Sequence, residues 1–466
     1  MALLSLNYDV LSAIVEQTDP CSALKLSMVS RRAYELGITQ ALASVTLSRS
    51  QLQVSAFCQF MLADRSRLPY LRELTIETGA FGVARYIEFQ RSADFSAAAE
   101  LADLLERTHR LRCLSIACFE DLIASEPRIA NAICALPDLV EIRLHNCGQL
   151  ALGVLSRMRS SLRKLTFTVL FNKKFPAFFH RLQSQDRVET LDVVHLDLSD
   201  GSLPDGEVHE IPSMPSVRSL SLRGSTARMS LFVRAMPNLQ RLRLSDVYTR
   251  AQSAPDSQKN ACWTRLAYLK GSVPDLQQWT VTCTVRWLQL GLTAYHYDTA
   301  LDIIRRTTPT ILSLPVETKV AATFWTQFVD AASGVRYLEL CLDEGKVQKL
   351  SWWLDHIPTL LRALSISSIF LCVRHTQRIG AEEDSKPVDV RSDRTCQTIR
   401  ERVAAAIPAL KYIAIAIATR GEDPFDEHQK APVWWQVSRM SGLTMLNIVP
   451  PEKGATLREH LVNTNY

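Results

Sequence analysis

The stretch Leu139-Val140-Glu141-Ile142-Arg143-Leu144-His145-Asn146-Cys147 decides the fold of this chain. Its apolar residues stand at the first, fourth and sixth places. Ile142 and Leu144 therefore point to one side of an extended strand, and Arg143 points to the other. Asn146 and Cys147 follow, where such a strand would bend away. We expect a short strand with one buried side, ended by a turn.

The same phrase recurs along most of the chain. Written as L-x-x-L-x-L, with Val or Ile allowed for Leu, its copies begin at Leu71, Leu111, Leu139, Leu162, Val188, Val217, Leu239, Val285, Val335, Leu361, Leu410 and Leu443. Leu266 and Ile311 begin two degraded copies. Most copies from Leu111 to Leu361 start roughly 22 to 29 residues apart. The spelling and the period resemble the leucine-rich repeat family, which implies a solenoid with parallel strands on a concave face and helices outside.

Helical patterns lie between the copies and are expected to complete the repeats. Apolar residues recur three to four places apart in residues 97–107, 128–136, 301–305, 324–329 and 399–404. Trp352-Trp353 and Trp434-Trp435 also fall in helical patterns and are interpreted as packing residues. The polar stretches 199–215, 246–260 and 374–395 break the period. We interpret them as exposed insertions between repeats.

The first residues follow a different pattern, typical of short helices. Leu6, Val10 and Ile14, with Leu11 and Val15 beside them, form one apolar helical face. The pair Asp19-Pro20 is expected to end that helix and open a second one, because Pro fits a first helical turn but not an interior. Two or three short helices enclose too little apolar surface to be stable alone. We therefore expect this segment to pack against a partner surface.

This N-terminal segment resembles the F-box on Leu6, Asp9, Val10, Ile14, Asp19, Leu24, Val29, Ser30 and Arg31, and its ending Val29-Ser30-Arg31-Arg32 is similar to fungal members. Asn7 departs from the usual Pro, and Ala33 departs from the usual Trp or Phe, with Tyr34 following it. The resemblance implies docking on a Skp-type adaptor, and through it on a cullin, by Leu6, Val10, Leu11, Ile14, Pro20, Leu24 and Val29. The predicted fold class is α/β, with a small all-α domain at residues 1–48 and a leucine-rich-repeat solenoid at residues 49–466.

Composition excludes several other classes of protein. The net charge of +5 is dispersed and predicts neither nucleic-acid nor membrane binding. The 11 Cys stand singly, so we expect reduced thiols in the cytosol or nucleus rather than disulfides or a zinc site. The start of the chain lacks the basic region of a signal peptide, and no apolar run reaches membrane-spanning length. No nucleophile, phosphate-binding or metal motif occurs, so we expect no catalysis, cofactor or metal.

The repeat strands nominate a substrate surface. The residues between the leucines are expected to line the concave face, where Arg and Lys outnumber Asp and Glu. We assign substrate binding to Arg143, Arg163, Arg218, Arg243, Arg286, Trp287, Arg336, Tyr337 and Arg362. Arg and aromatic side chains suit an acidic or phosphorylated protein segment. The simpler interpretation, which the sequence alone favours, is that L-R-x-L is this repeat's habitual spelling, with Arg stems along the strand edge and heads in water.

Two functions from different classes follow. In the first, the chain is the substrate-recognition subunit of an SCF-type cullin-RING ubiquitin ligase, which the F-box resemblance implies. It would hold a substrate protein near the conjugating enzyme and transfer nothing itself. In the second, the N-terminal helices only cap the first repeat, and the chain is a binding scaffold or inhibitor that recruits no ligase. Exposure of Val10 and Ile14 distinguishes the two.

Overall fold

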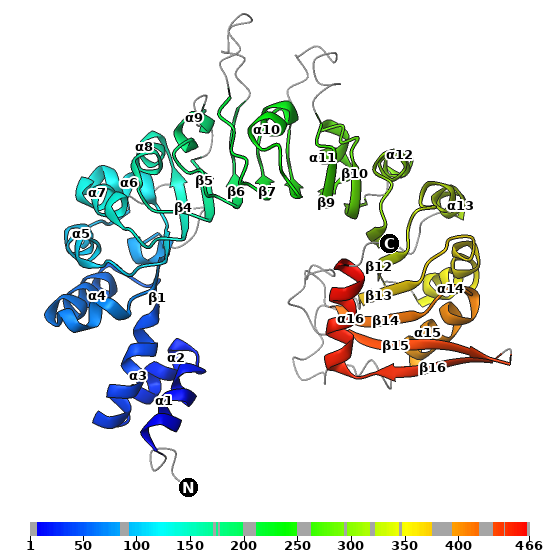
Figure 1. Cartoon of the computed structure of the whole chain (residues 1–466), viewed down its shortest axis with the longest axis horizontal. Helices are drawn as coiled ribbons and strands as arrows, with labels where there is room; N and C mark the ends of the chain where they lie inside the picture. Colours follow the sequence, from blue (N-terminus) through cyan, green and yellow to red (C-terminus); the bar gives the residue numbers. More distant parts are fainter. Residues whose placement is uncertain are drawn as a thin grey trace, which may run out of the picture. The chain divides into compact units, whose positions relative to one another are not determined.

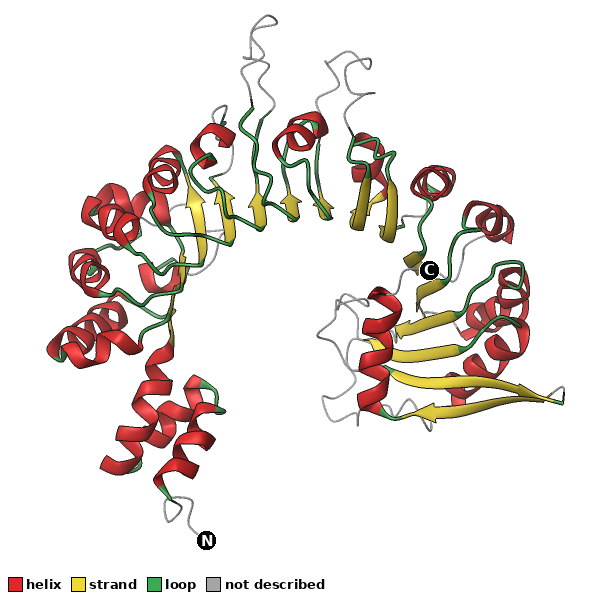
Figure 2. Cartoon of the chain, in the orientation of Figure 1, coloured by secondary structure: helices red, strands yellow, loops and turns green. Residues whose placement is uncertain are grey.

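The computed structural model describes residues 7–83, 93–170, 174–175, 178–198, 211–248, 262–292, 296–316, 322–343, 347–374, 394–418, 432–441 and 443–463. The chain divides into two compact units. Unit 1 comprises Met1–Leu239 and Val247–Pro255, and unit 2 comprises Gln240–Asp246 and Asp256–Tyr466. In both units the helices that join successive strands lie on one side of the sheet (Figure 2). The opposite side, which carries the third and fifth residues of the repeat phrase, is called the inner face below.

Unit 1 starts with helices and continues as a run of parallel strands (Figure 1). Its helices are α1 (Tyr8–Glu16), α2 (Pro20–Ser27), α3 (Arg31–Ala43), α4 (Gln51–Ala63), α5 (Ala98–Arg107), α6 (Phe119–Ser125), α7 (Pro127–Ala135), α8 (Gln149–Arg157), α9 (Phe178–Leu182) and α10 (Met229–Ala235), with 3-10 turns η2 (Arg65–Tyr70) and η3 (Thr78–Phe81). Its strands are β1 (Ser44–Leu47), β2 (Glu73–Ile76), β3 (Cys113–Ile116), β4 (Glu141–Cys147), β5 (Lys164–Val169), β6 (Thr190–Val194) and β7 (Ser219–Arg223).

The repeat phrase determines the pairing of these strands. Ile142 of β4 stands opposite Leu114 of β3 and Leu165 of β5, and all three side chains are fully buried. The same fourth place is filled by Leu191 in β6 and Leu220 in β7. Equivalent leucines therefore stack in rows between the sheet and its helices, so each repeat completes the core of its neighbour. The structure confirms the leucine-rich-repeat architecture expected from the spelling.

Several of the strands end near a residue in the left-handed backbone conformation, which holds the eighth place of the repeat phrase. Cys118, Asn146, His195 and Gly224 all have a positive φ, between 51° and 60°. Glycine adopts this conformation freely and asparagine adopts it more readily than most residues, which explains part of the composition there. At Gly224 a Cβ atom would lie 2.6 Å from Nδ1 of His195 in the preceding repeat, so only glycine fits. The bend expected at Asn146 is confirmed.

Unit 2 continues the same pattern. Its strands are β8 (Arg241–Ser245), β9 (Arg265–Ser272), β10 (Thr284–Gly291), β11 (Ile311–Val316), β12 (Tyr337–Asp343), β13 (Ser368–Arg374), β14 (Tyr412–Ala418), β15 (Val433–Met440) and β16 (Leu443–Val449). Its helices are α11 (Val273–Gln278), α12 (Tyr297–Thr307), α13 (Ala322–Ala331), α14 (Val347–Leu361), α15 (Arg394–Ala406) and α16 (Pro451–Asn463). Strands β8 to β14 pair in sequence order and in parallel.

The last two strands depart from the expected pattern. Strand β15 is antiparallel to β14, and β16 is antiparallel to β15, so the copy predicted at Leu443 belongs to a hairpin and not to a parallel repeat. Trp434 and Trp435 lie on β15, so their predicted helix was wrong, although both rings are buried as expected. Two adjacent buried Trp on opposite faces of a strand explain the pattern better than a helix does, because β15 is covered on both sides.

Two copies of the phrase were placed in the wrong register. Ile311, taken as the first place of a degraded copy, stands opposite Tyr337 and so holds the third place. Ser368 stands opposite both Tyr337 and Tyr412, so the strand copy begins at Ile366 rather than at Leu361. Leu361 is instead the last residue of α14. The segments that begin at Leu361 and at Ile366 both match L-x-x-L-x-L, but Leu361 belongs to the helix and only the second segment forms the strand. The remaining helical predictions are confirmed by α5, α7, α12, α13 and α15, and Trp352-Trp353 lie on α14 as expected.

Some expectations fall at boundaries. Helix α3 runs directly into β1, so the domain boundary at residues 48 and 49 stays a prediction. Most of the three predicted insertions lies outside the described residues. This applies to residues 199–210 of the first, 249–260 of the second and 375–393 of the third. In the part of the chain that the structure describes, no helix is long and apolar enough to cross a membrane.

Candidate protein-binding surfaces

Local capping shapes the three N-terminal helices α1 to α3, called the helical hook below. The carboxylate of Asp19 accepts a hydrogen bond of 3.0 Å from the backbone N–H of Ser22 and so caps α2. A hydrogen bond from the Ser22 side chain, and next the one from its backbone N–H, stabilises the charged form and lowers the pKa of Asp19. Ser30 caps α3 in the same way, accepting from the N–H of Ala33 at 3.1 Å. The caps create two sharp corners, which fold the helices onto one another.

The hook has a small core of its own. Leu11 and Val15 of α1 pack on Leu36 of α3, with Leu26 at the edge. Helices α2 and α3 approach closely at Gly37. A Cβ atom there would lie only 2.8 Å from the carbonyl oxygen of Ala23. Ala33, one turn before Gly37, has no exposed surface, so the aromatic ring usual at this place has no room there. Tyr34, the next residue, is 37% exposed, and its hydroxyl accepts a hydrogen bond of 3.5 Å from Arg67.

Apolar side chains left outside this core form the first candidate surface, called the hook surface below. Val10 and Ile14 are 48% and 37% exposed. Their neighbours on α2 and the following turn are also exposed: Leu24, Met28 and Val29. A monomeric soluble protein rarely leaves so many large apolar side chains together in water, so this pattern indicates a partner.

The structure divides the residues that the sequence assigned to this surface. Val10, Ile14, Leu24 and Val29 are exposed, and Pro20 is half-buried. Leu11 is 1% exposed, so its assignment to the surface was wrong, because the helix turns it inward onto Leu36. Leu6 lies outside the described residues. Sequence reasoning missed Met28 and Tyr8, whose apolar character beside the matched positions was the available signal.

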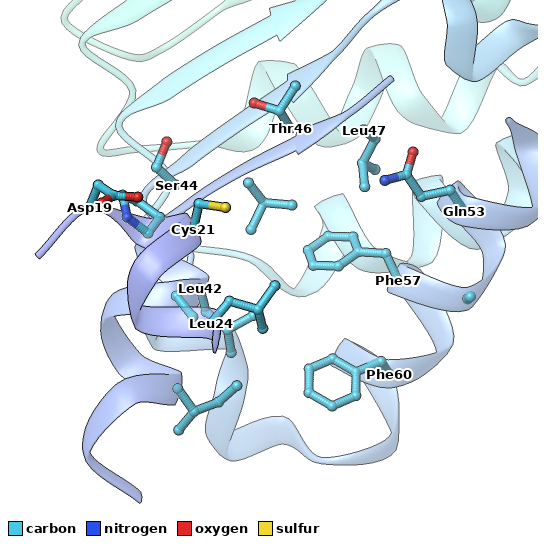
Figure 3. A pocket seen from close by; sticks show the side chains of 15 residues that line it. Asp19, Cys21, Leu24, Leu42, Ser44, Thr46, Leu47, Gln53, Phe57 and Phe60 are labelled. Carbon is cyan, nitrogen blue, oxygen red and sulfur yellow. The ribbon is translucent and has the colours of Figure 1, made fainter. Parts of the chain in front are cut away.

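A cleft of about 790 Å³ adjoins the hook surface (Figure 3). It lies between the hook and the first repeat, with Leu24 from α2, Leu42 from α3, and Phe57 and Phe60 from α4 among its lining residues. Cys21 and Asp19 stand at its edge in Figure 3. Arg67 stacks over the ring of Phe60, with its guanidinium carbon 3.9 Å from the ring centroid. No sequence motif marks the cleft, because its residues come from four separate elements.

The inner face carries fewer of the predicted arginines than expected. In β4 the alternation of exposed and buried residues places Glu141, Arg143 and His145 on this face. Arg243, at the equivalent fifth place of its repeat, also lies on it. Arg163, Arg218 and Arg336 hold the second place, directly before β5, β7 and β12, and Arg286 holds that place within β10, so their assignment to substrate binding stays a prediction. Arg362 follows α14 and precedes its strand, so its assignment also stays a prediction.

Backbone hydrogen bonds explain why the second place lies at the edge. The carbonyl of Arg163 accepts from the N–H groups of both Glu189 and Thr190 in the next repeat, at 2.8 and 3.0 Å. The carbonyl of Arg336 accepts from Ser367 and Ser368 in the same manner. This forked bond begins the ladder, so the regular alternation of side chains starts only one residue later. The simpler interpretation of L-R-x-L, as Arg along the strand edge, fits these positions.

In unit 1 the inner face is polar and internally paired. Glu141 lies 2.6 Å from Nε of Arg143 and 3.0 Å from Nζ of Lys164, and Asp192 lies 3.2 Å from Arg223. Burial acts to raise the pKa of Glu141, but hydrogen bonds from Lys164 and Arg143 outweigh it and the pKa lies below its usual value. Such part-exposed pairs contribute little stability and remain free to exchange partners. This face suits a polar protein surface.

In unit 2 the inner face is aromatic and covered. Trp287 and Tyr337 were expected to be exposed anchors, but they are 5% and 0% exposed. They belong to one cluster with Tyr268, Phe370 and Trp434. Helix α16 lies on this side of the sheet, opposite α14 and α15 (Figure 1), and contributes Leu461 to the same cluster. The prediction that Trp287 and Tyr337 contact substrate directly is therefore corrected.

A hydrogen-bonded chain runs through this cluster. Nε1 of Trp287 donates to Oγ of Ser313 at 2.8 Å, and Ser313 donates to Glu339 at 2.6 Å. Glu339 has no exposed surface, and its other carboxylate oxygen lies 3.5 Å from the guanidinium of Arg458 on α16. Burial, and next the charge of Glu339, raises the pKa of Tyr337 well above its usual value. The ionic contact of Arg458 with Glu339 thus joins α16 to this aromatic cluster.

Among the described residues, no group of three or more His, Cys, Asp or Glu side chains is placed to hold a metal ion. His145 contacts Thr168 at 3.1 Å, and its pKa is lowered by burial first and then by the charges of Arg143 and Arg223.

Comparison with known proteins identifies the hook. The family model described as the F-box domain matches residues 3–37. No curated protein sequence matches the chain. Two solved structures are similar in part: the leucine-rich repeat-containing protein LegL7 from Legionella pneumophila, and an internalin, InlF, from Listeria monocytogenes. LegL7 is 12% identical, with a TM-score of 0.36 over 78% of this chain and 95% of that one. InlF is 12% identical, with a TM-score of 0.26 over 66% and 75%.

Proposed function

We propose that this chain, an F-box protein with leucine-rich repeats, is the substrate-recognition subunit of an SCF-type cullin-RING ubiquitin ligase. The hook surface would dock on a Skp-type adaptor, and the repeats would hold the substrate protein. The observation that carries this proposal is the exposure of Val10, Ile14, Leu24 and Val29 within the matched segment, beside a core made by other residues. A hook that only capped the first repeat would turn Val10, Ile14 and Val29 inward, whereas of the four side chains Leu24 lines the cleft toward that repeat.

The energetics favour a partner for the hook surface. Each large apolar side chain that becomes fully buried contributes about 1.5 to 3 kcal/mol. The hook core of Leu11, Val15 and Leu36 is small, so the hook itself gains little from its own packing. Docking would bury Val10, Ile14 and Met28 without rearranging that core. This separation lets the surface be altered while the fold is kept.

The mechanism is proximity rather than catalysis. A substrate lysine held beside a loaded conjugating enzyme reacts as if at a much higher concentration, and the receptor supplies only the positions. The polar inner face of unit 1 offers hydrogen bonds and exchangeable ion pairs to a protein surface. If the substrate segment is acidic or phosphorylated, the predicted arginine that would bind it on the inner face of unit 1 is Arg143. On the inner face of unit 2, considered separately, it is Arg243. The free thiols of all 11 cysteines support a site of action in the cytosol or nucleus.

The test is co-purification of the full chain with a purified Skp-type adaptor. We expect the unmodified chain to capture the adaptor, and a Val10→Asp, Ile14→Asp variant to lose at least 90% of the captured adaptor. Leu150→Asp is the matched control, because Leu150 is equally exposed but lies on α8, among the repeats. It should capture the adaptor like the unmodified chain.

Two results would contradict the proposal. Capture by neither the unmodified chain nor the control would leave the chain as a leucine-rich-repeat scaffold or inhibitor. Equal capture by the double Asp variant would show that the hook surface is not the docking site. The circular dichroism and melting temperature of each variant must match those of the unmodified chain, which the exposure of all three positions predicts.

A further inference from the structure

The inner face of unit 2 differs in chemistry from that of unit 1. Strands β9, β10, β12, β13, β14 and β15 each contribute one aromatic ring to this side of the sheet. These rings are called the aromatic face below: Tyr268, Trp287, Tyr337, Phe370, Tyr412 and Trp434. Glu339, at the fifth place of its repeat, is the acidic group buried beside these rings. An apolar surface with one carboxylate at its centre is complementary to an apolar segment that carries one cation.

Helix α16 contacts this face through a regular set of residues. Gly454, Leu457, Arg458 and Leu461 stand at i, i+3, i+4 and i+7 of the helix. Leu457 and Leu461 pack in the cluster, and Arg458 lies over the ring of Phe370 and beside Glu339. Gly454 is buried against Trp434, where a Cβ atom would lie 2.7 Å from the ring. This spacing is the one by which an amphipathic helix binds the apolar surface of another protein.

The opposite side of α16 makes no use of the aromatic face. Glu452, Lys453 and Glu459 on that side are exposed. The helix follows β16 directly, so it is held near the face by covalent connection. A tethered segment experiences an effective concentration on the order of millimolar, and even a modest intrinsic affinity then keeps it bound. A separate helix with the same four contacts would meet the same surface.

We propose that the aromatic face is a binding surface for an amphipathic helix of a substrate protein, with the pattern small-x-x-Leu-Arg-x-x-Leu, and that α16 occupies this surface in cis. The arginine of the incoming helix would pair with Glu339, as Arg458 does. This inference rests on the proposed role of the repeats in holding a protein, but it is independent of adaptor docking. It assigns Trp287 and Tyr337 to a surface that becomes accessible when α16 leaves.

The experiment measures binding of a fluorescent peptide, residues 450–463, to the full chain by anisotropy. The unmodified chain should bind it weakly, because its own α16 competes. Arg458→Glu and Gly454→Ala each weaken the tethered helix, the first at Glu339 and the second at Trp434. Both variants should bind the unmodified peptide at least tenfold more tightly than the unmodified chain does. Glu459→Ala, on the exposed side of α16, is the matched control and should not change peptide binding.

The peptide is varied to identify the recognised class. Replacing its exposed residues, while keeping the glycine, both leucines and the arginine, should change its affinity for the Gly454→Ala chain by less than threefold. Replacing its arginine by glutamate should abolish binding to that chain. The Gly454→Ala substitution is informative because alanine favours an isolated helix, so only a clash at Trp434 would release α16.

Failure of this proposal can be distinguished from failure of the proposed adaptor docking. If folded Arg458→Glu and Gly454→Ala chains bind the peptide no better than the unmodified chain, α16 is a permanent part of the core and the proposal is overturned. Equal binding of the arginine and glutamate peptides would overturn the assignment of Glu339. Adaptor capture by the same variants, measured in parallel, should equal that of the unmodified chain. Loss of peptide binding with capture intact would leave the ubiquitin-ligase proposal standing.

Discussion

The guanidinium of Arg458 lies 3.5 Å from the carboxylate of Glu339, which stands 119 residues earlier in the chain. Glu339 has no exposed surface, and Ser313 satisfies its second oxygen. Breaking such a pair by removing one partner costs about 3 to 5 kcal/mol when the remaining charge stays buried. Release of α16 would let water reach Glu339 and so limit that cost.

Substitution Arg458→Ala should therefore loosen α16 before it unfolds the repeats. We expect amide hydrogen exchange to accelerate at least tenfold across residues 451–463, while the amides of β4 keep their protection. Glu459→Ala should leave both segments unchanged. An equal acceleration in β4 would show that the pair stabilises the whole chain and not the docking of one helix.

At Ala33 a larger side chain should destabilise the hook. Ala33→Trp places a ring where no exposed surface remains, beside the close approach of α2 to α3, and overpacking of this kind costs about 1 to 3 kcal/mol. Thermal unfolding should show a lower melting temperature. Tyr34→Trp, at a partly exposed neighbour, is the control and should be nearly neutral. A neutral Ala33→Trp would mean that the hook can accept the aromatic residue usual in the F-box.

Two glycines should respond to alanine in opposite directions. Gly224 has a φ of 55°, and an added Cβ would meet Nδ1 of His195 at 2.6 Å, so Gly224→Ala should cost about 1 to 3 kcal/mol. Gly153 lies within α8 with open space around it, so Gly153→Ala should stabilise the chain by up to about 1 kcal/mol. Urea unfolding at neutral pH measures both. The same sign for both variants would refute the turn geometry.

Thiol labelling should follow exposure. Burial first, and then the charges of Glu100 and Asp103, raises the pKa of Cys58 to about 12, so this thiol stays protonated and unreactive near pH 7.5. Cys21 and Cys262 are exposed and should react first with a maleimide, as mass spectrometry of digested protein would show. Because Cys21 borders the cleft beside the hook surface, bound adaptor should slow its labelling and leave Cys262 unaffected. Equal rates with and without adaptor would contradict docking there.

Acid should destabilise the chain in part through His145. Its pKa in the folded chain lies below the ordinary value of 6.5, so the unfolded chain binds the proton more readily. The contribution of neutral His145 to the free energy of unfolding is fully present above about pH 6.5. It is lost as the pH falls from there toward the pKa of His145 in the folded chain. His145→Asn, which cannot titrate, should show a smaller fall in melting temperature between pH 7.5 and 5.5. The control is His109→Asn, at an exposed position; its melting temperature should fall over this pH range by as much as that of the unmodified chain.

Much of the architecture follows from local spelling. The places of Ile142 and Leu144 predict strand, buried side and repeat in one phrase, because each repeat packs only on neighbours of the same spelling. The hook was also recognisable, since its capping residues Asp19 and Ser30 act within a few residues of their own helices. Exposure of Val10 and Ile14 was expected as well, whereas the inward turn of Leu11 depends on Leu36 of another helix.

The sequence by itself determined the repeated strand, its buried leucines and the N-terminal helices, because these depend on periodicity and on hydrogen bonds between near neighbours. Only the tertiary structure decided which arginines reach the inner face, since the forked backbone bond at Arg163 and Arg336 shifts the start of the strand by one place. It likewise decided between Leu361 and Ile366, which share one spelling. Helix α16 packs in one cluster with Trp287 and Tyr337, which lie far from it in the chain. Local sequence patterns do not predict such long-range contacts.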